Sequence, residues 1–306
     1  LGATKVQIGF QSLSDRVLAL NRRGHDVEAT RRAVTLLRRA GFKLHAHWMA
    51  NLYGSSPELD LEDFGRLFAD PALRPDELKI YPCSLLESAE LYDIHRAGKW
   101  RPYTDDELLE VLVGCLGRVP PWCRVTRVIR DIPSHEIVVG NRKTNFRQLA
   151  EAELARRGGR CRDIRAREVR GRRVEAGEVS LRRHEYATRG GREVFLEMID
   201  AEERIAGFLR LSLPTGAAPC AELDGAALLR EVHVYGALAA FGEAPDGAAQ
   251  HRGLGRRLVT EATSEAAAAG YRHLAVISAV GTRGYYRTLG FEDGELYQHR
   301  ALPPGC

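Results

Sequence analysis

Two glycines separated by one residue lie in a run that is typical of a phosphate-binding turn. Gly253 and Gly255 stand at the start of a helix-like run that closes at Gly270. Glycine lets a ligand approach the main chain closely, and the first amides of a helix are unpaired donors at the positive end of its dipole. The spacing predicts a pyrophosphate site, with an ordinary helix entry as the alternative. The site would comprise Gln250, His251, Arg252, Gly253, Leu254, Gly255 and Arg256.

Two adjacent tyrosines follow this run and are candidates for proton transfer. Tyr285 and Tyr286 precede Leu289-Gly290-Phe291. A phenol can protonate a nearby leaving group by general acid catalysis. Tyr286 and Tyr285 are the candidates for this role. Packing of both rings against a sheet is the alternative interpretation.

A strand must position these groups, and residues 228–235 have the alternation of one. Val232 and Val234 would share one face, and Glu231 and His233 the other. Glu231 and His233 are candidates for orienting a water molecule. The alternative is that Glu231 pairs with an arginine and His233 fills an interface.

The order of these parts carries a family resemblance. A strand, the Gln250–Arg256 run, a helix, an apolar segment at 273–278 and a tyrosine-containing turn resemble the acetyl-CoA-binding half of the GNAT acyltransferases. The resemblance implies that the glycine run holds the pyrophosphate of coenzyme A. It also implies that two neighbouring strands splay to admit the pantetheine arm, which Val232 and Val234 would line. In that family a tyrosine protonates the departing thiolate, and the resemblance assigns this role to Tyr286, with Tyr285 as the second choice.

Charge is unevenly distributed along the 306 residues, although the net charge is only +4. Arginines crowd residues 156–173, and guanidinium groups bind phosphates and stack on unpaired bases. We expect a nucleic-acid partner there, against the alternative of a solvated basic face. The candidate RNA-binding residues are Arg160, Arg162, Arg165, Arg167 and Arg170.

Composition excludes several classes of protein. No apolar run is long enough to span a bilayer, and the chain lacks a secretory type of start. Its six cysteines are scattered without short repeating spacings, which favours a reducing cytoplasm over a disulfide framework. The first residues, Leu1-Gly2-Ala3, contain no Met and suggest a fragment.

The N-terminal third predicts an α/β unit. Strands are expected at 5–10, 42–49 and 77–81, with helices starting near Ser14, after an Asp26 N-cap, and near Asp60. This alternation predicts parallel strands with crossover helices. Thr104 to Glu107 forms a capping box that predicts a further helix.

Several longer motifs extend the resemblance over essentially the whole chain. Residues 6–13 (VQIGFQSL) are similar to a late strand of HemN-like radical SAM enzymes. Residues 76–82 (DELKIYP) make this similarity more specific. With residues 127–133 (RVIRDIP), 161–169 (CRDIRAREV) and 231–236 (EVHVYG) in the same order, the chain resembles the catalytic subunits of Elongator in their bacterial form.

The resemblance implies a fold class and domain limits. The fold is α/β, with the C-terminal portion of a radical SAM partial (β/α) barrel at 1–100. A helical and basic linker would occupy 101–165, and a GNAT-type mixed α/β domain 166–306.

The resemblance also implies an activity. The family modifies the wobble uridine of tRNA toward 5-carboxymethyluridine, using acetyl-CoA, S-adenosylmethionine and a 4Fe-4S cluster. No two cysteines here stand three apart, so we expect this chain to lack the cluster and the radical step, and to retain acetyl-CoA and tRNA binding. A protein lysine acetyltransferase and a non-catalytic binding module are alternatives. The resemblance leaves open whether the chain binds further subunits or forms a homodimer.

A zinc ion is the remaining implied cofactor. Some relatives carry zinc near the Cys161 position, where Asp163 replaces an expected second cysteine. The ligands would be Cys123, His135 and Cys161, with Cys83 as a fourth. Because structural zinc sites normally have four nitrogen or sulfur ligands, buried thiols are the alternative.

Overall fold

The computed structural model describes residues 2–303 except 130–136, 140–144, 171–175 and 236–247. Contacts divide it into two compact units. One contains residues 7–33 and 45–166, and we call it the parallel-sheet unit. The other contains residues 1–6, 34–44 and 167–306, and we call it the large-sheet unit.

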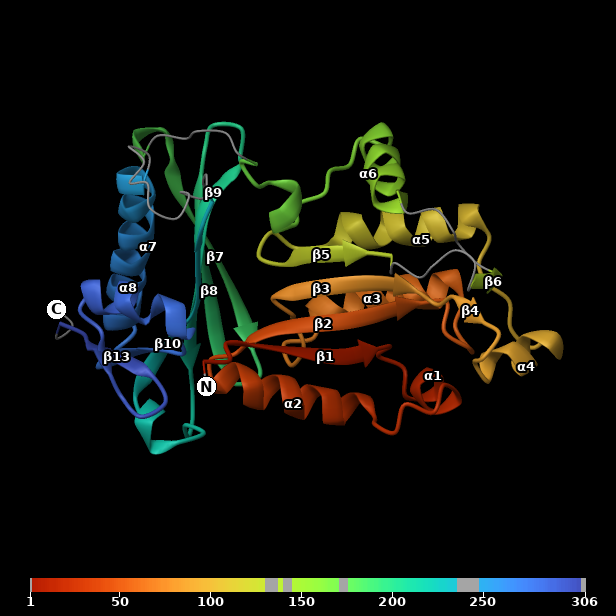
Figure 1. The fold of residues 1–306 in the computed structure, drawn as a ribbon, viewed down its shortest axis with the longest axis horizontal. Coiled ribbons are helices and arrows are strands. Elements are labelled where there is room, and N and C mark those ends of the chain that lie inside the picture. The colour runs from red at the N-terminus through yellow and green to blue at the C-terminus, as the bar shows by residue number, and fades with distance from the viewer. Residues whose placement is uncertain (1, 130–136, 140–144, 171–175, 236–247, 304–306) are drawn as a thin grey trace. The chain divides into compact units, whose positions relative to one another are not determined.

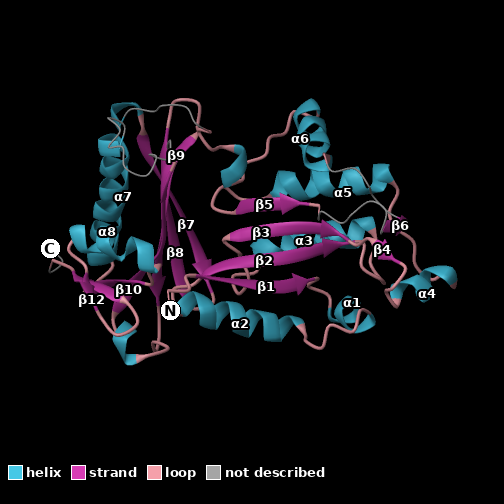
Figure 2. Cartoon of the chain, viewed as in Figure 1, coloured by secondary structure: helices cyan, strands magenta, loops and turns pink. Residues whose placement is uncertain are grey.

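The parallel-sheet unit is built from alternating strands and helices (Figure 2). Its four-stranded sheet has the order β1-β2-β3-β5, and β3 is parallel to both β2 and β5. The strands are β1 (Lys5–Gln11), β2 (Lys43–Ala50), β3 (Glu77–Pro82) and β5 (Arg124–Val128), with β4 (Leu85–Leu86) and β6 (Ile137–Val139) as a separate pair. The helices are α1 (Asp15–Leu20), α2 (Val27–Arg39), α3 (Pro57–Ala69), α4 (Leu91–Arg96), α5 (Asp105–Arg118) and α6 (Phe146–Arg156).

Local signals in the sequence fix several helix starts. The Ser14 side chain accepts from the Val17 amide at the start of α1, and Asp26 accepts from the Ala29 amide before α2. The capping box of Thr104 and Glu107 is formed at the start of α5. Such caps satisfy first-turn amides that the helix leaves unpaired. These three expected starts are confirmed, whereas α3 begins at Pro57, three residues before Asp60.

Helix α3 carries two buried carboxylates that hold the chain beyond β1 and β2. Asp63 accepts from the Leu13 amide at 2.8 Å and from Trp48 Nε1 at 2.8 Å. Asp60 accepts from the Asn51 amide at 2.7 Å and from Tyr103 Oη at 2.8 Å. These bonds replace water for groups that are otherwise costly to bury. They set the loops at the C-terminal ends of both strands.

Burial makes the Asp60 carboxyl a source of pH dependence. It raises the pKa of Asp60 from its ordinary value to about 6. A raised folded-state pKa stabilises the fold below the unfolded value, near 4, and this contribution is lost as the pH rises through about 6. We expect a loss of about 3 kcal/mol over that window, since one pKa unit is worth about 1.4 kcal/mol.

Urea denaturation of the parent and Asp60→Asn at pH 4.5 and pH 7 measures this contribution. The variant should lose less stability than the parent between the two values. Equal losses would show that Asp60 does not titrate differently in the folded chain.

The large-sheet unit is a seven-stranded sheet with the order β12-β13-β11-β10-β9-β8-β7. Pairs β7–β8, β8–β9 and β9–β10 are antiparallel, whereas β10 and β11 are parallel. The strands are β7 (Ser180–Thr188), β8 (Gly191–Ile199), β9 (Ile205–Pro214), β10 (Ala226–Val234), β11 (His273–Val276), β12 (Glu292–Asp293) and β13 (Gln298–Ala301). The helices are α7 (Ala248–Ala268) and α8 (Arg283–Thr288).

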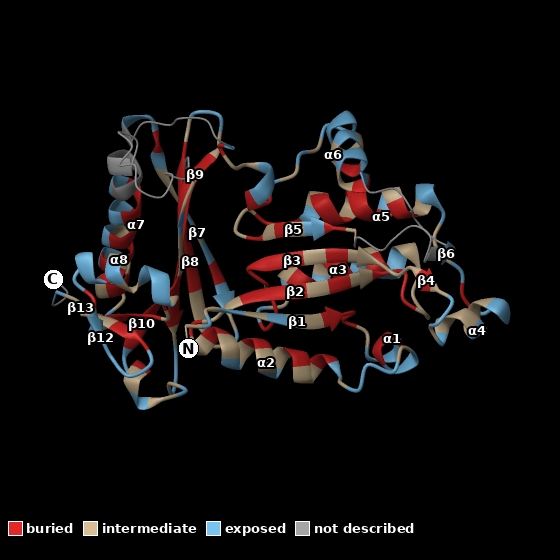
Figure 3. Cartoon of the chain, in the orientation of Figure 1, coloured by how far each residue is buried: buried red, intermediate tan, exposed pale blue. Residues whose placement is uncertain are grey.

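Helix α7 and the inner strands form the core of this unit, where buried residues follow β8 and β9 (Figure 3). Leu258 and Ala262 of α7 are in one apolar cluster with Leu209 and Leu229 of the sheet. Burial of such side chains supplies about 25 cal/mol per Å² of apolar surface. The core therefore fixes α7 against β10, the strand that carries the candidate site.

Candidate functional site

The parallel strands β10 and β11 of the large sheet separate partway along their length. β10 pairs with β11 from Ala226 to Leu229, where Leu229 lies opposite Val276. The β9–β10 register then shifts between Leu229 and Glu231, which is a bulge at Arg230. Beyond it, residues 231–234 pair with β9 alone among the described strands. A bulge bends and twists its strand, and a strand edge that lacks a neighbouring strand can accept an extended ligand in its place.

Helix α7 starts earlier than its sequence predicts. It begins at Ala248, so Gly253 and Gly255 lie inside the helix rather than in its first turn. The first-turn amides therefore belong to residues 248–251. The expectation that the two glycines stand at the start of the helix is corrected by this result. The side chains of Gln250, His251 and Arg252 lie outside the described part.

The two glycines have different surroundings. A Cβ at Gly253 would meet no atom within 4 Å, and this residue is exposed. A Cβ at Gly255 would lie 2.3 Å from the hydroxyl of Tyr285. Gly255 therefore leaves room for a ring of α8, whereas Gly253 leaves open space on the surface of α7. Of the neighbouring residues of the run, Leu254 is buried in the core and Arg256 is exposed.

The two tyrosines have different surroundings. Tyr286 is buried in the core, with its ring 5.5 Å from Phe291 and 5.6 Å from Tyr285. Burial, then the neighbouring Tyr285 and the charge of Glu231, raise the pKa of Tyr286 above its ordinary value. Burial also raises the pKa of Tyr285, against the opposing charge of Arg256. Tyr285 thus lies beside α7, and Tyr286 lies within the electrostatic reach of the bulge on β10.

The polar face of β10 is tied to neighbouring side chains. Glu231 accepts from Lys43 Nζ at 2.6 Å and from Arg210 Nε at 2.9 Å. The exposed His233 lies against the Phe208 ring, with centroids 5.6 Å apart. The apolar neighbours Val232 and Val234 pack against the core that includes α7. Pairing of Glu231 with an arginine matches the alternative that we set beside its catalytic role.

Several arginines of the basic segment bind carboxylates or carbonyls of the same chain. Arg165 donates to the carbonyl of Thr126. Arg167 donates to the buried Glu197 at 2.8 Å, and Arg156 and Arg157 both pair with Glu153. Arg165 and Arg167 are therefore structural links within the fold. Arg160, Arg162 and Arg170 are exposed.

The described residues give little support to a zinc site. Cys123 is fully buried, and the Cys161 thiol lies 3.0 Å from the Asp163 carboxylate. Burial and then the Asp163 charge raise the pKa of Cys161. No group of three potential ligands is present in the described ranges. His135 lies outside them.

Asp163 has another set of partners. It accepts from Arg147 Nη2 at 3.1 Å and from the Val125 amide at 3.0 Å, and it is fully buried. A buried charge requires such pairing. At the position where a cysteine was expected, the chain thus carries a buried ion pair that joins α6 to β5.

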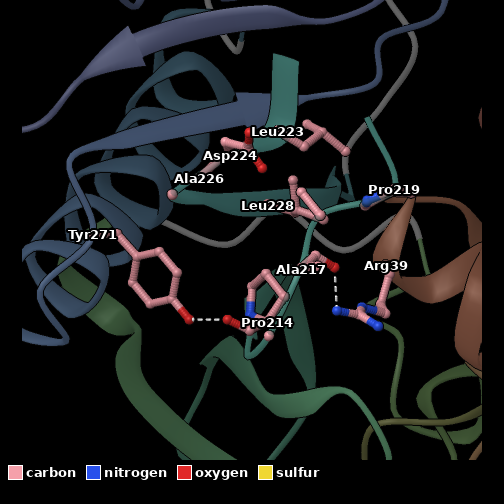
Figure 4. Close-up of a pocket in the computed structure, with 12 residues that line it drawn as sticks. Arg39, Pro214, Ala217, Pro219, Leu223, Asp224, Ala226, Leu228 and Tyr271 are labelled. Atoms are coloured by element: carbon pink, nitrogen blue, oxygen red, sulfur yellow. Dashed lines mark hydrogen bonds between the residues drawn. The ribbon is translucent and has the colours of Figure 1, made fainter. Parts of the chain in front are cut away.

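A small cavity lies near the first residues of β10 (Figure 4). Its volume is about 130 Å³. Tyr271 Oη donates to the carbonyl of Pro214 at 2.6 Å, and Arg39 donates to the carbonyl of Ala217. None of the predicted site residues lines it.

Comparison with known families matches two domain models to successive parts of the chain. Residues 75–156 match the Radical_SAM C-terminal domain, and residues 161–291 match the Acetyltransferase (GNAT) family. The solved structure of an archaeal Elp3 from Methanocaldococcus infernus, with an N-terminal deletion, superposes with a TM-score of 0.88. It is 36% identical, and the match covers 99% of this chain and 73% of that one. The chain belongs to the Elp3 family.

Two curated relatives support the assignment to the Elp3 family. The tRNA uridine(34) acetyltransferase of Dehalococcoides mccartyi is 41% identical over 95% of this chain and 65% of its own length. Elongator complex protein 3 of Homo sapiens is 38% identical over 98% of this chain and 56% of its own length. The chain thus spans less than two thirds of these relatives. The expected radical SAM part followed by a GNAT part is confirmed.

Proposed function

We propose that this chain is the acetyl-CoA-binding and tRNA-binding part of an enzyme that forms a carboxymethyl group on the wobble uridine of tRNA. The separation of β10 from β11 at the Arg230 bulge, beside α7 and Tyr286, carries the proposal. The tRNA substrate is inferred from a relative that is named as a tRNA uridine(34) acetyltransferase. This name does not favour a lysine acetyltransferase or an inert binding module.

Acetyl-CoA fits this part of the chain. The edge of residues 231–234 that faces away from β9 offers main-chain groups to the pantetheine arm. The first turn of α7 offers amides to the pyrophosphate. The open space above Gly253 admits a close approach by the ligand. Val232 and Val234 would flank the arm, and Tyr286 would stand at the thioester end.

S-adenosylmethionine and a 4Fe-4S cluster belong to the family's radical step. The described cysteines are free thiols, and we place the tRNA reaction in the reducing cytoplasm. Among the residues that the structure describes, no helix combines the length and apolar character needed to cross a bilayer.

Calorimetric titration with acetyl-CoA tests the binding site. Gly253→Asp places a negative charge near the expected pyrophosphate and should weaken binding at least about tenfold, or about 1.4 kcal/mol. Gly253→Ala is the matched control for loss of the glycine. Its Cβ meets open space, and alanine favours a helix, so its fold should be intact. Equal affinity of parent and Gly253→Asp would contradict a pyrophosphate at this place.

The salt dependence of tRNA binding tests the proposal that this chain binds tRNA. Replacing the exposed Arg160 and Arg162 with Ala should weaken tRNA binding and lower the salt slope by about one for each phosphate that the variant no longer binds. Arg156→Ala is the control because Arg156 is an arginine of the same segment that is not among the candidate RNA-binding residues and pairs with Glu153. An unchanged salt slope in the double variant would place the RNA surface elsewhere.

A further inference from the structure

A lysine from the N-terminal part of the chain reaches the candidate catalytic carboxylate. Lys43, the first residue of β2, lies 188 positions before Glu231 and donates to Glu231 Oε1 at 2.6 Å. Arg210 donates to the other oxygen, Oε2, at 2.9 Å. The Lys43 and Glu231 side chains are 18% and 11% exposed. Both carboxylate oxygens are thus held by charged donors, which make short and directional bonds.

The segment that carries Lys43 is anchored to the same sheet. Arg230, the bulge residue, donates to the carbonyl of Phe42 at 2.7 Å. Tyr297 Oη donates to the carbonyl of Ala40 at 2.9 Å. Residues 34–44 belong to the large-sheet unit together with β10. These bonds limit the positions available to the Lys43 ammonium group. They therefore also limit the positions of the Glu231 carboxylate that it binds.

The position of Glu231 on β10 connects the Lys43–Glu231 pair to the proposed reaction of acetyl-CoA. Glu231 is the first residue after the bulge, in the part of β10 that has left β11. Its charge contributes to the raised pKa of Tyr286, so the carboxylate lies within electrostatic reach of the phenol. An ionised carboxylate accepts about four hydrogen bonds. The bonds from Lys43 and Arg210 therefore leave capacity for a water molecule on Glu231.

We propose that Lys43 is a positioning residue for thioester hydrolysis, which acts by orienting Glu231. The inference rests on the proposed function. The water oxygen bonds to the carbonyl carbon of acetyl-CoA, the carbon–sulfur bond breaks, and Glu231 accepts a proton from the water. Tyr286 gives a proton to the departing sulfur. The net reaction is water and acetyl-CoA to acetic acid and coenzyme A, and solvent restores both side chains.

Three variants of the chain separate orientation from packing in a tRNA-dependent acetyl-CoA hydrolysis assay. Lys43→Met should lower kcat at least about tenfold with KM nearly unchanged, because it removes a transition-state interaction rather than ligand binding. Lys43→Arg keeps a charged donor and should recover most of the loss. Arg39→Met is the matched control. Arg39 anchors the same segment through the carbonyls of Thr215 and Ala217 and does not contact Glu231.

A double-mutant cycle decides whether Lys43 acts through its partner. Lys43→Met combined with Glu231→Gln should be no slower than Glu231→Gln alone, since coupled residues are not additive. Parent-like turnover of Lys43→Met, or equal losses in Lys43→Met and Arg39→Met, would overturn the inference alone. Failure of the parent to bind or hydrolyse acetyl-CoA would overturn the proposed function and this inference together.

Discussion

Tyr286→Phe should lower the rate of acetyl-CoA hydrolysis by about 10²- to 10⁴-fold, the usual contribution of a positioned general acid. The phenol protonates the departing thiolate in our proposal. Phenylalanine keeps the ring that packs against Phe291 but has no proton to give. The affinity for acetyl-CoA should change little, because the hydroxyl is needed when the carbon–sulfur bond breaks.

The pH dependence of the parent supplies a second test of the same role. Burial, together with Tyr285 and Glu231, raises the pKa of Tyr286. The phenol should therefore stay protonated, and competent as an acid, through neutral and moderately alkaline pH. Loss of activity near pH 8 through ionisation of this tyrosine would disagree with its burial.

Tyr285→Phe is the matched control for this prediction. The two tyrosines are adjacent, but the Tyr285 hydroxyl lies beside Gly255 of α7. We expect Tyr285→Phe to hydrolyse acetyl-CoA at a rate much closer to the parent. Single-turnover assays with each variant, after melting curves have shown that both fold, assign the acid. If Tyr285→Phe is inactive and Tyr286→Phe is not, the roles of the two tyrosines are exchanged.

Asp163→Ala should destabilise the parallel-sheet unit by about 3–5 kcal/mol, the usual effect of removing one partner from a buried ion pair. The substitution leaves the Arg147 guanidinium, whose side chain is 14% exposed, without its buried carboxylate. It also removes the acceptor for the Val125 amide in β5. Urea denaturation measures the loss.

A half-buried carboxylate with two exposed arginine partners provides the comparison. Glu153 pairs with Arg156 and Arg157 on the surface of α6. Solvent screens such pairs, so Glu153→Ala should have a much smaller effect than Asp163→Ala. Similar losses in the two variants would show that burial does not set the contribution of Asp163. Stability of the parent that depends on added zinc would show that a metal acts at this position.

Short-range patterns in the sequence predicted the elements and the family. The N-cap at Asp26 and the capping box at Thr104 were predictable because each pairs residues within one helical turn. The order of motifs along the chain predicted both parts of the Elp3 family, since homologous segments keep their order. The cleft strand β10 was also anticipated, because Val232 and Val234 alternate with polar neighbours.

Strands β7, β8 and β9 were not anticipated from the sequence. Charged residues interrupt their apolar pattern, and Glu193, Glu197 and Arg210 are all buried in the sheet. In the linear sequence these residues resemble the surface of a basic segment. Their partners are far away along the chain, as with the bond from Arg167 to Glu197. Only folding shows that such charges satisfy one another.

The sequence by itself determined the kinds of chemistry available: glycines for a phosphate, phenols for a proton and arginines for an RNA backbone. Tertiary structure decided which of these groups meet. It placed Gly255 under Tyr285, and it brought Lys43 to Glu231. No local pattern encodes a contact across 188 residues, because it depends on how sheets and helices share a core rather than on the period of any one element.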